Sequence, residues 1–268
     1  MLVNCGLSNG TNKGLKVSIV VTQLNIYPVK SIAGISQAQS ELTKTGLLND
    51  RQFMLVNQAG EFITGREYPL LTQVSSTIVH DGIELKATGM PLLKVPCSQR
   101  DLASMTVKVW RDNVRATLVG VEYDAWFSRY LMVECHLVRL PEETARSADA
   151  NFAGEGQYVS FADGYPILLI SQASLDDLNS RLEQPVSMAR FRPNIVVSGC
   201  GAYAEDGWGD FSVGGVSLKG VKNCSRCIFT TVDPETGVKN IDVEPLKTLS
   251  GYRRRREGGG ISRAECHP

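Results

Sequence analysis

The chain has 268 residues, of which 43% are hydrophobic, with 28 basic and 28 acidic side chains and seven cysteines. This length allows one large or two modest domains, and the balanced charge gives no reason to expect a nucleic acid or an acidic membrane as a partner. No apolar run approaches the roughly 20 residues that span a bilayer. The polar, glycine-rich start lacks the apolar core of a secretory signal. We therefore expect a cytoplasmic protein with reduced thiols and no membrane partner.

The first half of the chain is predicted to form a β domain over residues 20–140, after a segment, 1–19, that we expect to be disordered or extended. Short runs rich in β-branched and aromatic residues are typical of strands. Such runs occur at 24–29, 51–56, 61–65, 72–79, 107–110 and 114–119. Asp81-Gly82 lies between two strand-like runs and predicts a hairpin, because both turn positions favour a positive φ.

The second half adds helices to further buried strands. Helical spacing of apolar residues predicts a helix over 122–132. Ser174 and Asp177 have the spacing of a capping box, which predicts a helix that starts there and runs to Leu182. Apolar, β-branched content predicts buried strands at 194–199 and 227–232. The polar stretch 141–156 is the expected domain boundary, and the fold class is mainly β with a few helices.

One cysteine pair is closely spaced, Cys224 and Cys227, in the sequence CSRC. A structural zinc site needs four ligands, and the chain offers no second pair. A thioredoxin-like dithiol starts a helix after a strand, whereas this pair precedes a β-branched run. A third interpretation is a thiolate beside the cationic Arg226, able to bind a soft or high-valent metal. From the spacing alone, two ordinary thiols remain the simplest interpretation.

Four segments in chain order resemble one known family. They are YPVKS (27–31), NDRQFMLVNQAGEFITGRE (49–67), ILLISQASLDDLNSRL (167–182) and the stretch that contains RFRPN and CSRC (190–238). The last resembles the core of a MOSC domain, found in molybdenum-cofactor sulfurases and amidoxime-reducing enzymes. The first two resemble the N-terminal β-barrel domain of the amidoxime-reducing branch. The resemblance implies an N-terminal MOSC β-barrel domain, a MOSC β-barrel domain over 145–252, and a cofactor at their junction.

The resemblance also implies roles for individual residues. Cys227 corresponds to the protein ligand of molybdenum and is the expected catalytic residue. The positions that match cofactor contacts are Lys30, Ser31, Arg51, Asp163, Arg192, Asn194, Ser225 and Arg226. The chemistry agrees with this set, since a phosphorylated, anionic pterin cofactor needs cationic and hydroxyl donors that converge from several loops.

The implied function is a molybdenum-cofactor-dependent reductase of N-hydroxylated compounds, such as hydroxylamines, amidoximes and N-hydroxylated bases. The resemblance implies that the electrons come from a separate protein of the flavin, iron–sulfur or haem type, and the chain has no four-cysteine cluster of its own. The family is also associated with pyridoxal phosphate binding. Two alternatives remain open at this point. Cys227 could carry a persulfide in sulfur transfer, or the chain could be a non-catalytic cofactor-binding module.

The end of the chain departs from the family pattern. After PLKTLSGY (245–252) the family continues into the final strands of its barrel, whereas this chain reads RRRREGGGISRAECHP. Four arginines and three glycines without apolar periodicity predict a disordered basic tail over 253–268. We therefore expect the second domain to lack its last strands and to present an open sheet edge.

Overall fold

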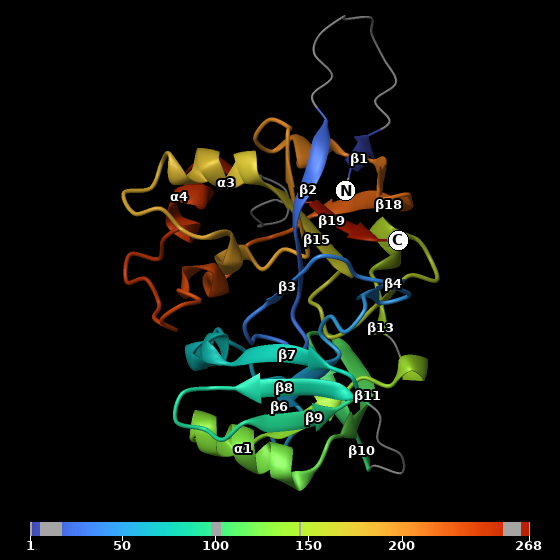
Figure 1. Cartoon of the computed structure of the whole chain (residues 1–268), viewed down its shortest axis with the longest axis vertical. Helices are drawn as coiled ribbons and strands as arrows, with labels where there is room; N and C mark the ends of the chain where they lie inside the picture. The colour runs from blue at the N-terminus through green and yellow to red at the C-terminus, as the bar shows by residue number, and fades with distance from the viewer. Residues whose placement is uncertain (1, 6–17, 98–102, 145, 254–263, 268) are drawn as a thin grey trace, which may run out of the picture.

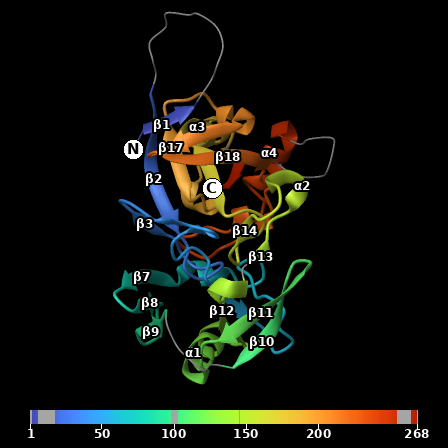
Figure 2. The same cartoon turned by 90° about the vertical axis from the view of Figure 1, so that its right-hand side faces the viewer.

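The computed structural model describes residues 2–5, 18–97, 103–144, 146–253 and 264–267. Its strands form two lobes, one above the other in Figure 1 and again in the perpendicular view of Figure 2. We call them the barrel lobe, built on an eight-stranded sheet, and the hairpin lobe, built on two smaller sheets. The expected class, mainly β with a few helices, is confirmed. No helix among the described residues has the length and apolar character to cross a membrane.

The barrel lobe is a sheet whose neighbouring strands are antiparallel except for the parallel pair β15–β16. In spatial order its strands are β1 (Leu2–Cys5), β17 (Asp210–Val213), β18 (Val216–Asn223), β19 (Ala264–His267), β15 (Ile167–Ser171), β16 (Ile195–Ser198), β2 (Ile19–Ile26) and β3 (Ile35–Gln37). Because β1 pairs with β2 as well as with β17, the order of strands closes on itself.

The hairpin lobe contains a four-stranded and a three-stranded sheet covered by helix α1 (Val121–Leu131). The four-stranded sheet is β10 (Ser104–Val109), β11 (Asp112–Leu118), β12 (His136–Arg139) and β6 (Phe53–Val56), and the other is β7 (Ser75–Val79), β8 (Gly82–Lys86) and β9 (Leu93–Pro96). The remaining elements are β4 (Leu42–Thr43), β5 (Gly46–Leu47), β13 (Arg146–Ser147), β14 (Tyr158–Val159), α2 (Ala150–Ala153), α3 (Gln172–Asn179), α4 (Leu246–Arg253) and the 3-10 helices η1 (Pro69–Gln73), η2 (Glu142–Thr144), η3 (Met188–Phe191), η4 (Ala204–Gly207) and η5 (Ile228–Thr231).

The two faces of β15 and β16 show why apolar runs form these strands. Leu169, Ile195 and Val197 belong to the core inside the barrel. Their neighbours Ile170 and Val196 point the other way and pack with side chains of α3 and α4. Side chains alternate between the faces of a strand, so a strand buried on both faces reads as a continuous apolar run.

Strand β2 belongs to the barrel lobe although the sequence analysis placed it in the first domain. It pairs with β16 and β3. Just after β2 the chain passes into the hairpin lobe, where the Lys30 amide donates to the carbonyl of Phe53 (2.8 Å) and Val29 forms a β-bridge to the same residue. The YPVKS segment therefore joins the two lobes.

Several local predictions are confirmed and two are wrong. The hairpin at Asp81-Gly82, the helix over 122–132 and the strand within 194–199 are present as β7–β8, α1 and β16. The N-cap of α3 is Ser171, whose side chain accepts from the Ser174 amide, and the helix ends at Asn179. The run 227–232 contains a 3-10 turn, η5, instead of a strand. Local threonine hydroxyl bonds compete with strand pairing there.

The expected disordered tail is wrong for Ala264–His267, which form β19. This strand lies between β18 and β15 and pairs with both, so it fills the place where we expected an open edge. Sheet edges offer backbone donors and acceptors that any extended segment can satisfy, whatever its side-chain pattern. Residues 254–263 and 268 lie outside the described part of the chain.

The placement of β19 is tested by amide hydrogen exchange on the intact protein. Amides of Ala264–His267 that pair with β15 and β18 should exchange slowly, at rates like those expected for β15, because opening them requires opening the barrel. Exchange at free-chain rates throughout 264–267 would show that the last strand is not formed.

Candidate functional site

One pocket at the junction of the two lobes is lined by all nine residues that the sequence analysis selected. We call it the junction pocket. These residues are Lys30, Ser31, Arg51, Asp163, Arg192, Asn194, Ser225, Arg226 and Cys227. They come from the segments after β2, before β6, before β15, before β16 and after β18. The structure thus brings together residues up to two hundred positions apart, while their individual roles remain predictions.

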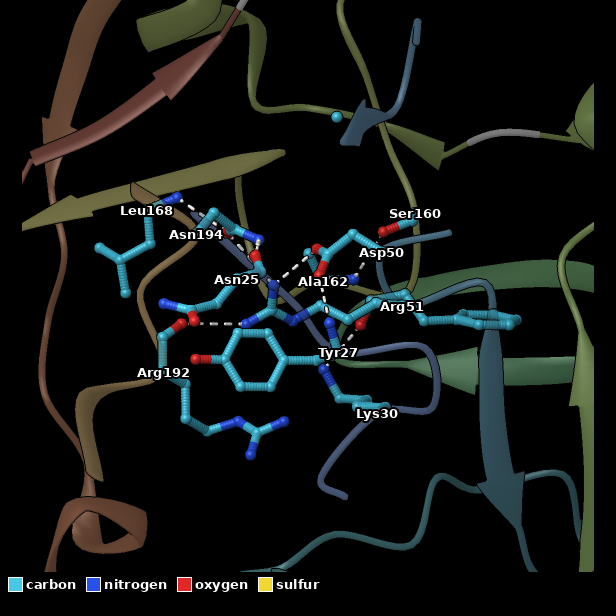
Figure 3. Close-up of polar contacts among 12 residues, drawn as sticks. Asn25, Tyr27, Lys30, Asp50, Arg51, Ser160, Ala162, Leu168, Arg192 and Asn194 are labelled. Carbon is cyan, nitrogen blue, oxygen red and sulfur yellow. Dashed lines mark hydrogen bonds and ion pairs between the residues drawn. The ribbon is translucent and has the colours of Figure 1, made fainter. Parts of the chain in front are cut away.

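A buried carboxylate organises the wall of the pocket (Figure 3). Asp50 is fully buried, and its Oδ1 accepts from the backbone N–H of Tyr27 (2.8 Å) while its Oδ2 accepts from Nη1 of Arg51 (2.6 Å). Arg51 also donates to Oδ1 of Asn194 (3.2 Å) and to the carbonyl of Arg192 (3.3 Å). The Asp50–Arg51 pair therefore ties together three segments from both halves of the chain, at residues 27, 50–51 and 192–194.

Asn194 continues this network into the barrel. Its side chain is buried, with Oδ1 accepting from the amide of Leu168 (3.1 Å) as well as from Arg51, and with Nδ2 donating to the carbonyl of Asn25 (3.1 Å). An asparagine amide has two N–H groups, so one hydrogen remains for a ligand. Asn194 therefore holds the strands that surround the pocket, and its contact with a cofactor stays a prediction.

Two guanidinium groups lie over the ring of Tyr27. The Cζ atoms of Arg51 and Arg192 are 4.5 and 4.1 Å from the ring centre. Burial raises the pKa of Tyr27 to about 12, so the phenol stays neutral. Burial, together with the positive charge of Arg51, lowers the pKa of Arg192 to about 10, and the group remains protonated at neutral pH. Nη1 of Arg192 donates to the carbonyl of Ile32 (2.7 Å), whereas Nη2 is buried with no acceptor among the described residues.

Lys30 and Asp163 form an ion pair at the side of the pocket. Nζ of Lys30 donates to Oδ1 of Asp163 (2.5 Å) and to the carbonyl of Phe161 (2.7 Å). Burial lowers the pKa of Lys30, and the carboxylate opposes this shift. The side chain of Asp163 is 57% exposed, and the charges of Lys30 and Arg66 and a hydrogen bond from Trp110 hold the pKa of its carboxyl well below its usual range. The carboxylate is therefore ionised at neutral pH.

The two thiols of CSRC differ in their surroundings. Nη1 of Arg226 lies 3.1 Å from Sγ of Cys224, and its Nη2 donates to the carbonyl of Phe191 (2.8 Å). The cation that we expected beside the metal-binding thiolate thus faces Cys224. Cys227 is exposed at the start of η5. Within the described side chains, no three His, Cys, Asp or Glu residues group as a metal-binding cluster.

Three residues of the junction pocket have left-handed backbone conformations. The φ values are 77° at Ser31, 50° at Arg51 and 56° at Arg192. Residues other than glycine rarely adopt this region, at a cost of about 1–3 kcal/mol each. Such conformations persist only where the surrounding contacts fix them, and they concentrate at functional sites. Here they turn the side chains toward one pocket.

The lining of the pocket is strongly basic. It includes six basic side chains, at positions 30, 51, 66, 190, 192 and 226, against one carboxylate, Asp163. The sequence analysis did not select Tyr27, Asp50, Arg66 or Arg190, although each lies inside a quoted motif. The signal that could have found them was their place within those motifs, since nothing in the local sequence distinguishes them from ordinary surface side chains. The excess of positive charge suits an anionic ligand.

Two family models match the chain, the MOSC N-terminal β-barrel domain over residues 18–134 and the MOSC domain over 156–264. Mitochondrial amidoxime-reducing component 1 of Mus musculus is 40% identical over 87% of this chain and 71% of its own length. Mitochondrial amidoxime reducing component 2 of Bos taurus is 37% identical, over 91% and 75%. The Homo sapiens component 1 is 39% identical, over 87% and 72%.

The network around Asn194 is tested by its replacement with alanine. Asn194→Ala leaves the part-buried amide of Leu168 and the part-buried carbonyl of Asn25 without the hydrogen bonds of this side chain. Each buried group left unpaired costs about 1–3 kcal/mol, so the free energy of unfolding should fall by about 2–4 kcal/mol in urea titration. Asn57→Ala removes hydrogen bonds in an exposed turn, where water replaces them, and should cost less than about 1 kcal/mol. Equal losses in the two variants would contradict this account.

Proposed function

Because the chain belongs to the family of MOSC proteins with a MOSC N-terminal β-barrel domain, to which the mitochondrial amidoxime-reducing components also belong, we propose that it reduces N-hydroxylated compounds with a molybdenum cofactor held in the junction pocket. The observation that carries the proposal is the convergence of five loops on one pocket with six cations and the two cysteines of CSRC.

The pocket has donors that fit an anionic, phosphorylated cofactor. Nη2 of Arg192 and Nε of Arg226 are buried, and neither has an acceptor within the described part of the chain. A buried N–H group without a partner costs about 1–3 kcal/mol, and a phosphate oxygen would remove that cost. Lys30 contributes a further donor, because an ammonium group has three N–H bonds and two of them meet Phe161 and Asp163.

Cys227 is the residue proposed to bind the metal. It lies on the pocket wall and is exposed, so a metal centre could approach its sulfur without rearrangement of the core. Its carbonyl accepts hydrogen bonds from the amide and the hydroxyl of Thr230 (3.1 and 2.9 Å), which fix the backbone beneath the thiol. When bound, the molybdenum cofactor would supply a centre that exchanges two electrons with the substrate.

The proposed reaction breaks the N–O bond of the substrate. The oxygen leaves as water, the nitrogen keeps its carbon substituents, and the reaction consumes two electrons and two protons. We propose that the electrons come from a separate flavin, iron–sulfur or haem protein. The protein's own residues bind and orient. The basic side chains hold the cofactor, and the Asp50–Arg51 pair keeps the loops that carry them in register.

The exposure of Cys227 also favours a second candidate function. An accessible thiol can carry a persulfide and pass sulfur to another molecule. This alternative needs no resident metal. The two candidates therefore differ in what the purified protein contains.

The proposal is tested on protein produced in a host that makes the molybdenum cofactor. We expect stoichiometric molybdenum and pterin fluorescence, together with turnover of a hydroxylamine by a reduced viologen dye. Persulfide on Cys227 without metal would support sulfur transfer instead. Cofactor bound without turnover would indicate a binding module.

A first prediction concerns the metal ligand. Cys227→Ser should abolish turnover of a hydroxylamine and leave the thermal midpoint near that of the wild type, because the side chain is exposed and serine is a poor ligand for a soft metal site. Cys224→Ser is the matched control and should keep most of the activity. Equal loss of activity in both variants would rule out a single thiolate ligand.

A second prediction concerns the anionic cofactor. Arg192→Met removes a buried, unpaired N–H group and should weaken cofactor retention about tenfold to hundredfold, the equivalent of about 1.5–3 kcal/mol for one charge-assisted bond. Arg190 lines the same pocket, but its guanidinium is already paired with Asp233 (2.7 Å) and the carbonyl of Thr231 (2.9 Å). Arg190→Met should therefore lose less cofactor. The pterin content after dialysis measures cofactor retention in both variants. A larger loss in Arg190→Met than in Arg192→Met would place the phosphate elsewhere.

A further inference from the structure

A second hollow adjoins the junction pocket and shares Thr64 and Arg66 with it. We call it the annex, and its walls include the aromatic side chains of Phe62, Tyr68 and Trp110. Its charged residues are balanced, with Glu61 and Glu67 against Arg66 and Lys108. The junction pocket is suited to an anion, whereas the annex is suited to a molecule with little net charge.

Trp110 is the most unusual residue of the annex. It stands at the turn between β10 and β11 with a φ of 57°, and 42% of its surface is exposed. A large aromatic residue in the left-handed region at an exposed turn is both strained and incompletely desolvated, which argues against a role in packing alone. Glycine or asparagine would form such a turn at a lower cost. A tryptophan is therefore present at a turn whose backbone conformation disfavours it.

Contacts on several sides hold the indole in one orientation. Its Nε1–H donates to Oδ1 of Asp163 (3.2 Å), and the guanidinium carbon of Arg66 lies 4.3 Å from the ring centre. The ring of Phe62 is 5.1 Å away at an angle of 58°. The guanidinium of Arg66 therefore lies over the indole ring, the ring of Phe62 is tilted against it, and the hydrogen bond fixes the Nε1 edge. A planar π system bound beside this group would gain favourable quadrupole and cation–π contacts.

Asp163 connects the annex to the junction pocket. The same Oδ1 that accepts from Trp110 also accepts from Nζ of Lys30. One carboxylate therefore joins the aromatic wall of the annex to the cationic wall of the neighbouring pocket. A ligand bound against Trp110 would lie beside the residues that we assign to the cofactor.

We propose that the annex is the recognition site for the aromatic part of planar N-hydroxylated substrates, with the ring on the Trp110–Arg66 stack and the N–OH group directed into the junction pocket. The inference rests on the proposed function for the identity of the reacting group. It adds the substrate class, which is aromatic and heteroaromatic compounds of low net charge. Small aliphatic N-hydroxylated compounds reach the junction pocket but gain nothing from the annex.

The test measures binding, so that it does not depend on turnover. Isothermal titration of the purified full-length protein compares benzamidoxime, which has a ring, with acetamidoxime, which has none. Trp110→Leu should weaken benzamidoxime binding about fivefold to tenfold, as expected for the loss of one aromatic contact. The affinity for acetamidoxime should stay within about twofold, a change of under about 0.4 kcal/mol.

Two further variants separate the possible causes of weaker benzamidoxime binding in Trp110→Leu. Trp110→Phe keeps a ring but loses the hydrogen bond to Asp163, and should retain most of the preference for benzamidoxime. Phe152→Leu is the matched control, because Phe152 is 46% exposed and has a cation, Lys222, 4.3 Å from its ring centre, at a place outside both hollows. This control should bind both compounds like the wild type.

The proposal is overturned if the wild type binds the two compounds equally, or if Trp110→Leu weakens both by the same factor. The proposed function fails in a different way. If molybdenum-loaded protein reduces neither amidoxime but the preference for benzamidoxime and its loss in Trp110→Leu persist, the annex is a binding site for aromatic compounds and the reductase assignment is wrong.

Discussion

The buried ion pair between Asp50 and Arg51 is the interaction on which the junction of the two lobes depends. Asp50 is inaccessible to solvent, and Arg51 joins it to Asn194 and to the backbone of Arg192. Removing one partner from a buried pair costs about 3–5 kcal/mol, because a charge is left without compensation. The carboxylate also accepts from the amide of Tyr27, at the end of β2. The fold thus uses one acidic side chain to fix three of the loops that surround the junction pocket.

The same pocket concentrates features that are unfavourable for stability. Ser31, Arg51 and Arg192 have left-handed backbones, and the lining holds six cations, of which Lys30, Arg51 and Arg190 pair with Asp163, Asp50 and Asp233. The positive charges still outnumber the carboxylates that face them. Strain and repulsion of this kind are retained where a ligand benefits from them. An anionic ligand would relieve the repulsion and pair the buried N–H groups of Arg192 and Arg226. Binding of such a ligand would relieve these unfavourable terms, and this relief would add to the binding affinity.

The sequence predicted the class of fold and nine of the residues that line the junction pocket, because the motifs that carry them are long and occur in the family's order. It could not predict the partners within the pocket. Nothing local indicated that the side chain of Asn194 bonds to strands β15 and β2, because these contacts join residues far apart in the chain. The contact of Arg226 with Cys224 is local, but a cysteine lies on each side of the arginine in CSRC, and the spacing alone did not show which one the guanidinium faces. The strand at Ala264–His267 was missed for another reason: pairing of backbone groups between β18 and β15 does not require an apolar pattern.

X-ray absorption at the molybdenum edge tests the central claim most directly, because it counts the sulfur atoms bound to the metal. The account predicts that wild-type protein loaded with cofactor shows one sulfur neighbour more than the Cys227→Ser variant, with the Cys224→Ser variant like the wild type. Identical sulfur coordination in the wild type and in Cys227→Ser would contradict the assignment of Cys227 as the ligand. It would show that the protein holds the cofactor in the junction pocket through its basic side chains alone.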